Sequence, residues 1–549
     1  MPMTQAPDAP DRDWWRGAVI YQIYPRSFQD SNGDGIGDLK GIIARLGHVA
    51  ELGADAIWIS PFFTSPMKDY GYDVSDYRDV DPIFGALSDF DALIAEAHRL
   101  GLRVMVDLVI SHTSDRHPWF RESRMGRDGP RADWYVWADP KPDGTAPNNW
   151  LSQFGGSAWS WDPARMQYYL HNFLAAQPDL NLHHPEVQDA LLDITRYWLD
   201  RGVDGFRLDT VNYYFHDPLL RDNPALPPEE RNDTTAPAVN PYNFQQHLYD
   251  KTRPENLAFL RRFRALLDEY PATTAVGEVG DGQRGLEIAG EYTSGGDKMH
   301  MCYAFEFLAP DMPDAARIRA VVEHFGAVAP DGWACWAFSN HDVVRHVTRW
   351  GALVADRPAL ARVLASVLLS LRGSVCLYQG EELGLTEADI AFDDLHDPYG
   401  KEFWPEYKGR DGCRTPMAWE ADSRNAGFSD AQKLWLPMPV EHRLAAVSTQ
   451  RGVEGSVLEH YRRFLAFRRR HPALVKGEIA FLDAGAALGF IRSDGGERLL
   501  CLYNLTAEPL RLPAPEGDWH LLTGHGLEGG FDGGMADLPP WGGLIAAGY

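Results

Sequence analysis

Cysteine is scarce in this sequence of 549 residues. The five cysteines are scattered, and no two of them form a CxxC pair; they are Cys302, Cys335, Cys376, Cys413 and Cys501. An odd number of isolated cysteines indicates neither a disulfide framework nor a zinc site. We therefore expect the protein to work in a reducing compartment and predict that it is cytoplasmic.

Basic residues are also outnumbered. The chain has 52 lysines and arginines against 78 aspartates and glutamates, which gives a formal net charge of −26. This charge repels nucleic acids and anionic membranes, so we expect neither as a partner. A neutral small molecule is the expected ligand. The acidic surface is expected mainly to keep the protein soluble. The protein is expected to be a monomer or a homodimer.

Long apolar runs are missing as well. The most apolar region, residues 360–379, is interrupted by Arg362 and Arg372, which argues against a membrane span and favours a helix followed by a strand. Residues 1–12 are polar and proline-rich without an apolar segment. They predict a loose tail, not a signal peptide.

What the sequence does contain is a regular alternation of apolar strand-like runs with helical stretches. Strands are expected at 17–24, 54–59 and 103–111, with helices at 39–52 and 87–100 between them. Further strands are expected at Gly205, Ala275, Met301, Cys335 and Ser374, which brings the number to eight. The alternation predicts an α/β fold, a parallel (β/α)₈ TIM barrel with functional residues at the C-terminal ends of its strands.

Three regions depart from this alternation. Residues 111–184 are rich in Trp, Pro and Gly and too long for one loop, so they predict a loop-rich subdomain inserted after the third strand. An irregular stretch at 213–246 is expected to form a wall of the pocket. Short β-like runs near the end predict a C-terminal antiparallel β-sandwich. The predicted domains are the barrel, 1–110 and 185–473; the insert, 111–184; and the sandwich, 474–549.

Residues 202–212 contain an arginine and a carboxylate at the end of a predicted strand. Because side chains alternate along a strand, Arg207 and Asp209 are expected on the same side. A neighbouring guanidinium keeps a carboxylate ionised and available as a nucleophile, although an isolated pair of this kind is more often structural.

Three further segments of the same form favour a catalytic site. With residues 202–212 they comprise 103–112, 274–280 and 335–342. In order and spacing the four segments resemble the conserved strand segments of the α-amylase family of glycoside hydrolases, glycoside hydrolase family 13. Residues 177–181, QPDLN, resemble the additional signature of its α-glucosidase and oligo-1,6-glucosidase branch. The similarity runs from about Trp14 to the C-terminus and implies a retaining mechanism.

Retaining hydrolysis of a glycosidic bond needs a carboxylate nucleophile and a second carboxyl group as acid and base. Asp209 suits the nucleophile. Glu278 has apolar neighbours in the sequence, which raise the pKa of a carboxyl group, so it suits the acid/base. The resemblance gives Asp342 the third catalytic place, binding sugar hydroxyls in the transition state.

The resemblance also implies a set of substrate-binding residues: Asp69, Tyr72, His112, Phe154, Phe173, Arg207, Thr210, His341 and Arg410. It places Asp69 and Tyr72 on the terminal non-reducing sugar, with Arg410 pairing to Asp69 and closing the pocket. A pocket closed at one end implies an exo-acting enzyme. Relatives with valine after the nucleophile prefer α-1,6 bonds, so Thr210 favours α-1,4 bonds.

Two positions depart from the family pattern. Ser111 replaces the asparagine that ligates calcium in α-amylases, so that metal is not expected. Gly412 and Cys413 replace asparagine and alanine in the segment after Arg410, which weakens the assignment of Arg410.

Residues 30–38, DSNGDGIGD, alternate oxygen-bearing side chains with turn residues. Hard cations take six or more oxygen ligands, and Asp30, Asn32, Asp34 and Asp38 with the Ile36 carbonyl supply most of them. The alternative is a turn-rich loop that caps the next helix through Asp38. The resemblance implies a structural cation here, Ca²⁺ or Mg²⁺; no organic cofactor is expected.

The function predicted from the sequence is an exo-acting, retaining α-glucosidase for maltose-type α-1,4 glucosides, sucrose and aryl or alkyl glucosides, with transglucosylation as a side activity. Two alternatives stay open. One is a sucrose or maltose isomerase or a trehalose synthase-type transferase on the same scaffold. The other is a non-catalytic, amylase-like binding protein, which predicts a membrane anchor and lost catalytic carboxylates.

Overall fold

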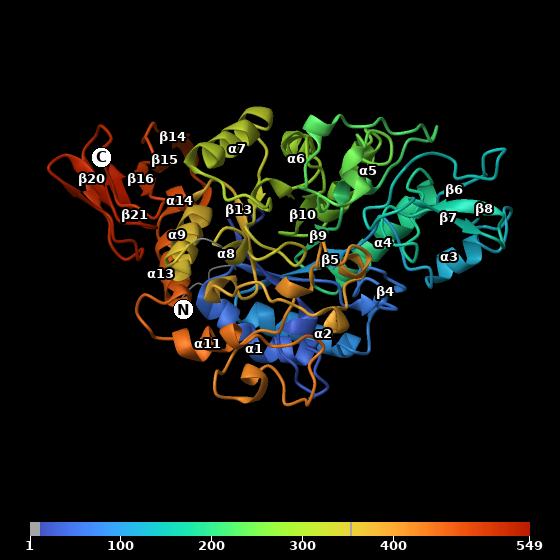
Figure 1. Cartoon of the computed structure of the whole chain (residues 1–549), viewed down its shortest axis with the longest axis horizontal. Helices are drawn as coiled ribbons and strands as arrows, with labels where there is room; N and C mark the ends of the chain where they lie inside the picture. The colour runs from blue at the N-terminus through green and yellow to red at the C-terminus, as the bar shows by residue number, and fades with distance from the viewer. Residues whose placement is uncertain (1–10, 352–353, 549) are drawn as a thin grey trace, which may run out of the picture.

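The computed structural model describes residues 11–351 and 354–548. The predicted N-terminal tail lies outside this range except for Asp11 and Arg12. The barrel occupies the middle of the molecule, with the C-terminal sheets at one end and the inserted sheet at the other (Figure 1).

Eight parallel strands form the barrel, in the order β11-β10-β9-β5-β2-β1-β13-β12. Their bounds are β1 (Val19–Ile23), β2 (Ala56–Ile59), β5 (Arg103–Leu108), β9 (Gly205–Leu208), β10 (Thr274–Val279), β11 (Met301–Ala304), β12 (Cys335–Trp336) and β13 (Ser374–Tyr378). A parallel bridge between Cys302 and Ala334 joins the two ends of the sheet. Most of these strand residues are buried, as expected for parallel strands covered by helices. The predicted TIM barrel is confirmed.

Helices surround the barrel (Figure 1). The longer ones are α1 (Leu39–Leu52), α2 (Leu87–Arg99), α4 (Pro185–Asp200), α5 (Asn256–Asp268), α6 (Gly285–Thr293), α7 (Ala315–Val328), α9 (Arg357–Ser370) and α13 (Val457–Arg469). In α4 the buried residues Val187, Leu191, Ile194 and Trp198 recur at three- to four-residue spacing, so one face packs inward. Short helices in the connections are α8 (His346–Arg349), α10 (Pro398–Glu402), α11 (Val440–Leu444), α12 (Val447–Gln450) and α14 (Pro472–Lys476).

The region between β5 and β9 is the inserted subdomain that the sequence predicts, and it contains a small sheet that was not predicted. Its strands are β6 (Trp137–Ala138), β7 (Trp159–Asp162) and β8 (Gln167–Leu170), and helix α3 (Pro118–Ser123) precedes them. An antiparallel bridge between His112 and Asp179 ties the QPDLN signature to the end of β5. A short hairpin of β3 (Phe63–Thr64) and β4 (Asp76–Val80) follows β2.

The C-terminal part of the chain consists of two antiparallel sheets, as predicted. One has the order β14-β15-β16-β21-β18 and the other β17-β20-β19. Their bounds are β14 (Glu478–Phe481), β15 (Leu488–Asp494), β16 (Glu497–Tyr503), β17 (Leu510–Pro513), β18 (Trp519–Leu521), β19 (Gly530–Asp532), β20 (Met535–Leu538) and β21 (Gly543–Gly548). Helix α14 spans the predicted boundary at residue 474. Among the described residues, no helix is long and apolar enough to cross a membrane.

Candidate active site

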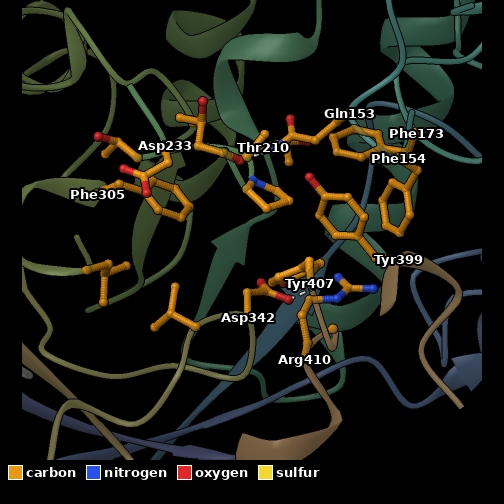
Figure 2. A pocket seen from close by; sticks show the side chains of 18 of the residues that line it. Gln153, Phe154, Phe173, Thr210, Asp233, Phe305, Asp342, Tyr399, Tyr407 and Arg410 are labelled. Carbon is orange, nitrogen blue, oxygen red and sulfur yellow. Dashed lines mark hydrogen bonds and ion pairs between the residues drawn. The ribbon is translucent and has the colours of Figure 1, made fainter. Parts of the chain in front are cut away.

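A cavity of about 460 Å³ opens at the C-terminal ends of the barrel strands, a size typical of small-molecule sites (Figure 2). Ten of the predicted catalytic and substrate-binding residues line it: Asp69, Tyr72, His112, Phe154, Phe173, Asp209, Thr210, Glu278, Asp342 and Arg410. The other two, Arg207 and His341, are fully buried and are not among the residues that line the cavity.

One buried guanidinium holds both carboxyl groups predicted to do the chemistry. Arg207 of β9 donates from Nη1 to Asp209 Oδ1 at 2.5 Å and to Asp107 Oδ1 at 2.9 Å. Its Nη2 lies 2.6 Å from Glu278 Oε2. Asp107 lies directly opposite Arg207 in the register of β5 with β9. The structure thus brings Asp209 and Glu278 together on one cation.

Asp209 and Glu278 both have pKa values near neutrality, whereas the sequence predicts that Asp209 stays ionised beside Arg207. Burial raises the pKa of Asp209 to about 7, because it outweighs Arg207, and the charges of Asp107 and Asp342 add to the rise. Burial likewise raises the pKa of Glu278 to about 7. The expectation that Arg207 keeps Asp209 ionised is therefore incomplete, since the guanidinium is shared and desolvation opposes it. The charges of Asp209 and Asp342 add to the rise in the pKa of Glu278.

Thr210 shapes the turn that follows Asp209. Its φ of 41° and ψ of 51° lie in the left-handed region, which is uncommon for a β-branched residue and concentrates at functional sites. This turn points the Thr210 backbone N–H at Glu278 Oε2, 3.0 Å away. The Thr210 hydroxyl lies 3.2 Å from the hydroxyl of Ser111. Ser111, one of the departures from the family pattern, therefore contacts the residue that follows the predicted nucleophile.

Arg410 lines the cavity and contacts two of its carboxylates. Its Nη2 donates to Asp69 Oδ1 at 2.8 Å, the pairing that the sequence predicts, and its Nη1 donates to Asp342 Oδ1 at 3.1 Å. Arg414 adds a second guanidinium, 2.9 Å from Asp342 Oδ1. Burial disfavours the ionised form of Asp342, but His341, Arg410 and Arg414 outweigh it and hold the pKa of that carboxyl well below its usual range. Asp342 is therefore ionised at neutral pH.

His341 lies behind this part of the cavity. Its Nδ1 is 2.7 Å from Gln22 Nε2, and its Nε2 is 2.5 Å from the Tyr72 hydroxyl and 3.2 Å from Asp342 Oδ2. The rings of Tyr72 and His341 stack at 5.3 Å. Both ring nitrogens thus contact protein groups. Direct hydroxyl binding by His341 stays a prediction, and in this structure the imidazole orients Tyr72 and Asp342.

The QPDLN signature contributes a residue that the sequence did not single out. Gln177, fully buried, donates from Nε2 to Asp69 Oδ2 at 3.1 Å and lies 3.2 Å from His112 Nε2. His112 in turn contacts the Tyr72 carbonyl at 3.0 Å. The insert therefore helps to position the residues predicted to bind the terminal sugar.

Aromatic rings form one wall of the cavity. Figure 2 shows Phe154, Phe173 and Tyr399 on one side, with Phe305 and Asp233 on the other. Phe154 lies 4.8 Å from Tyr399 and 6.2 Å from Phe173 between ring centroids. Such rings suit the apolar faces of a sugar. Phe154 and Phe173 are where the sequence predicts them, but Tyr399 was missed.

Much of the remaining lining comes from loops. The segment 233–238 lies within the irregular stretch predicted to form a wall, although its residues were not named. Residues that follow β11 and β12 also line the cavity: Phe305, Leu308, Pro310, Val343 and Val344. The sequence signal for them was their position after predicted strands. Asp107 and Arg414 also had a signal, since each is a charged residue inside a segment already identified.

The loop 30–38 folds through its own side chains. Asp30 Oδ1 accepts the N–H groups of Asn32 and Gly33, and Asp38 Oδ1 accepts the N–H of Gly41 as the N-cap of α1. The side chains of Asn32 and Asp34 are exposed. Within residues 11–351 and 354–548, no group of three or more His, Cys, Asp or Glu side chains is arranged to hold a metal. A cation bound here would therefore need further oxygen ligands, which the Asn32 amide oxygen and the Ile36 carbonyl could supply.

Comparisons with known proteins agree with this architecture. The alpha amylase catalytic domain family matches residues 22–477, and a domain of unknown function, DUF3459, matches residues 477–545. A probable alpha-glucosidase of Rhizobium meliloti (strain 1021) is 68% identical over 538 residues, covering 98% of this chain and 97% of the relative.

Two solved structures are also similar. The crystal structure of XgtA, an alpha-glucosyl transfer enzyme, has a TM-score of 0.95 and 56% identity, covering 99% of this chain and all of that one. The trehalulose synthase MutB of Pseudomonas mesoacidophila MX-45 has a TM-score of 0.87 and 35% identity, covering 98% of this chain and all of that one. The chain therefore belongs to the α-amylase family of glycoside hydrolases.

Proposed function

We propose that the protein is an exo-acting, retaining α-glucosidase that removes terminal non-reducing α-glucosyl residues from small α-glucosides. The observation that carries this proposal is the arrangement of its carboxylates. Asp209 and Glu278 share Arg207, while Arg410 joins Asp69 to Asp342 in the same cavity. This gives two groups for the chemistry beside a site for one terminal sugar.

In the first step Asp209 Oδ2 attacks the anomeric carbon, and the bond from that carbon to the glycosidic oxygen breaks. Glu278 donates its proton to the departing oxygen, so an alcohol leaves and a glucosyl ester forms on Asp209. Glu278 then removes a proton from water as the water attacks the ester. Glucose is released with its α configuration, and both carboxyl groups return to their starting states.

The lining supports small, uncharged substrates. Asp233 and Glu406 add negative charge to the cavity, which disfavours phosphorylated sugars. Phe305, Leu308 and Val343 add an apolar surface that suits an aryl or alkyl group as well as a second sugar. With Thr210 after the nucleophile, we propose maltose-type α-1,4 glucosides, sucrose and aryl or alkyl glucosides as substrates. Transglucosylation follows as a side activity when an alcohol replaces water.

The similarity to a trehalulose synthase favours one second candidate, an isomerase that returns the glucosyl group to the released sugar. The two functions differ in what attacks the glucosyl ester: water in the glucosidase, and another hydroxyl of the released sugar in the isomerase. A non-catalytic binding protein is disfavoured because Asp209, Glu278 and Asp342 are all present in one cavity.

Chromatographic product analysis over time tests the proposal, with maltose, isomaltose, sucrose and trehalose as substrates. The wild-type enzyme is expected to release glucose from maltose or sucrose, and an Asp209→Asn variant is expected to lose this activity. Disaccharide isomers formed without net glucose would instead support the isomerase. Equal inactivity of both proteins would support a binding scaffold.

We also propose a structural Ca²⁺ or Mg²⁺ ion in the loop 30–38. The exposed side chains of Asn32 and Asp34 support it, together with the Ile36 carbonyl and the carboxylates of Asp30 and Asp38. The ion would hold the loop in front of α1 and take no part in the chemistry.

A further inference from the structure

Asp397 lies directly behind Arg410 and outside the cavity. It belongs to the connection between β13 and α13, and its side chain is fully buried. It is the N-cap of α10, where its Oδ1 accepts the N–H of Tyr399 at 3.1 Å. Asp397 is not among the residues that line the cavity, so a bound sugar would reach it only through Arg410.

The Asp397 carboxylate accepts three hydrogen bonds from Arg410. Oδ2 accepts the Arg410 backbone N–H at 2.7 Å and its Nε at 3.1 Å, and Oδ1 accepts Nη2 at 2.8 Å. A carboxylate that binds a guanidinium fork at two points fixes the plane of the group as well as its position. The outer edge of that plane then faces Asp69 and Asp342, 2.8 and 3.1 Å away.

The backbone at Gly400 and Gly409 allows Asp397 to approach Arg410 this closely. Gly409 has a φ of +82°, and a Cβ atom there would lie 2.7 Å from both Asp397 Oδ2 and Gly400 Cα. A Cβ atom on Gly400 would lie 2.6 Å from the carbonyl oxygen of Lys408. The two chain segments therefore cross at a point where neither carries a side chain. Asp411 secures the other side by accepting the N–H groups of His396 and Asp397 at 2.6 and 2.8 Å.

We infer that Asp397 is a positioning residue for the terminal sugar, because it fixes Arg410 in the orientation that holds Asp69 and Asp342 together. Without its charge, the Arg410 guanidinium would be free to turn toward either of its two remaining carboxylates. The Arg410 end of the cavity would then lose its fixed shape. The inference rests on the proposed function in that it takes the Arg410 end of the cavity as the place of the terminal glucose.

The test measures maltose binding by calorimetry with all variants in an Asp209→Asn background, so that turnover does not interfere. Asp397→Asn is expected to weaken binding by about 30-fold or more, the loss typical of breaking a buried hydrogen-bonded charge pair. The matched control is Asp389→Asn, which removes the exposed ion pair of Asp389 with Lys408 in the same connection and is expected to leave binding unchanged. Near-UV circular dichroism shows whether each variant keeps its tertiary structure.

A double-mutant cycle separates positioning from a merely structural role. If Asp397 acts through Arg410, adding Asp397→Asn to Arg410→Ala causes little further loss of affinity. Wild-type affinity in a folded Asp397→Asn protein, or losses that multiply in the double variant, would overturn the inference. If Asp397→Asn does not fold, Asp397→Glu takes its place, because it keeps the charge but displaces the carboxylate. It is expected to melt near the parent temperature and to bind maltose more weakly; folded Asp397→Glu with parent affinity would overturn the inference.

The outcomes for the two proposals are distinct. If the wild type turns over no glucoside, the proposed function is overturned. If maltose binding nevertheless depends on Asp397, this inference is supported. Absence of maltose binding in the Asp209→Asn parent would overturn this inference, whereas the proposed function is decided by wild-type turnover. In active enzyme, the same loss should appear as a higher KM together with a lower kcat for Asp397→Asn.

Discussion

Asp107 and Arg207 face each other across neighbouring strands, and Arg207 Nη1 donates to Asp107 Oδ1 at 2.9 Å. Asp107 is fully buried, and Trp58 Nε1 and the Tyr72 hydroxyl donate to its other oxygen at 3.1 and 3.0 Å. Its charge therefore acts on Asp209 and Glu278 through the guanidinium that all three carboxyl groups share.

Replacing Asp107 by Asn is expected to move the pH profile of kcat/KM to lower pH. The charge of Asp107 helps to raise the pKa of Asp209 to about 7. Removing it makes proton loss from Asp209 easier, so the acidic limb moves to lower pH, and the alkaline limb, set by Glu278, moves the same way. The profile is measured with an aryl α-glucoside. Limbs that stay in place or move to higher pH would contradict the shared-guanidinium account.

Thr210→Val is expected to change linkage preference. The change replaces the hydroxyl beside Ser111 by a methyl group at the point where the bond to be cleaved would lie. The ratio of kcat/KM for maltose to that for isomaltose should fall by about ten-fold, the size of effect that one methyl group has in a pocket. Thr210→Ser keeps the hydroxyl and serves as the control. An unchanged ratio in the valine variant would remove Thr210 as a determinant of linkage.

The glycine at position 412 is expected to be required for stability. A Cβ atom there would lie 2.6 Å from the Ala388 carbonyl oxygen, so Gly412→Ala should lower the free energy of unfolding by about 1 to 3 kcal/mol through overpacking. Gly47→Ala in α1 is the matched control, since nothing lies within 4 Å of its Cβ position. It should stabilise the protein by about 0.5 to 1 kcal/mol. Denaturant unfolding measures both, and equal effects would contradict this account.

This packing also explains why glycine, and not the asparagine of the family pattern, occupies position 412. The close approach of the Ala388 carbonyl leaves no room for a side chain at Gly412. Cys413 is fully buried, and its Sγ lies 3.1 Å from the Arg410 carbonyl. Arg410 still reaches Asp69, so the departure does not displace it.

A cation in the loop 30–38 should raise the melting temperature. Added Ca²⁺ at about 100 times its dissociation constant stabilises a protein by about 2.7 kcal/mol, and a chelator should reverse the effect. Asp34→Asn is expected to weaken the response, whereas Asp394→Asn, an exposed acid in another loop, should not. Identical melting curves in Ca²⁺, Mg²⁺ and chelator would show that the loop is held by its own hydrogen bonds alone.

The strand ends of the site could be predicted from the sequence because they depend on local pattern. Arg207 lies in β9 and Asp209 directly follows it, Glu278 is the penultimate residue of β10, and Asp342 lies in the loop that follows β12. The support behind them could not be predicted in this way. Asp397 reaches Arg410 only because two loop segments cross at Gly400 and Gly409, and no periodic pattern records such a crossing.

The fold likewise has features that follow from local sequence pattern and features that depend on contacts between distant residues. The strand and helix positions followed from apolar periodicity, and the barrel followed from their alternation. The pKa of Asp209 did not follow, because it depends on burial and on Asp107, a residue 102 positions earlier in the chain that the barrel brings to the same arginine.

The central claim, that Asp209 is the nucleophile and Glu278 its acid/base, is tested most directly by trapping the intermediate. A Glu278→Gln variant is mixed with α-glucosyl fluoride, whose leaving group needs no protonation, so the first step proceeds while the second lacks its base. Peptide mass mapping is expected to find one glucosyl group, attached to the peptide that carries Asp209. A glucosyl group on another residue, or turnover of the fluoride to β-glucose without any covalent species, would contradict the account.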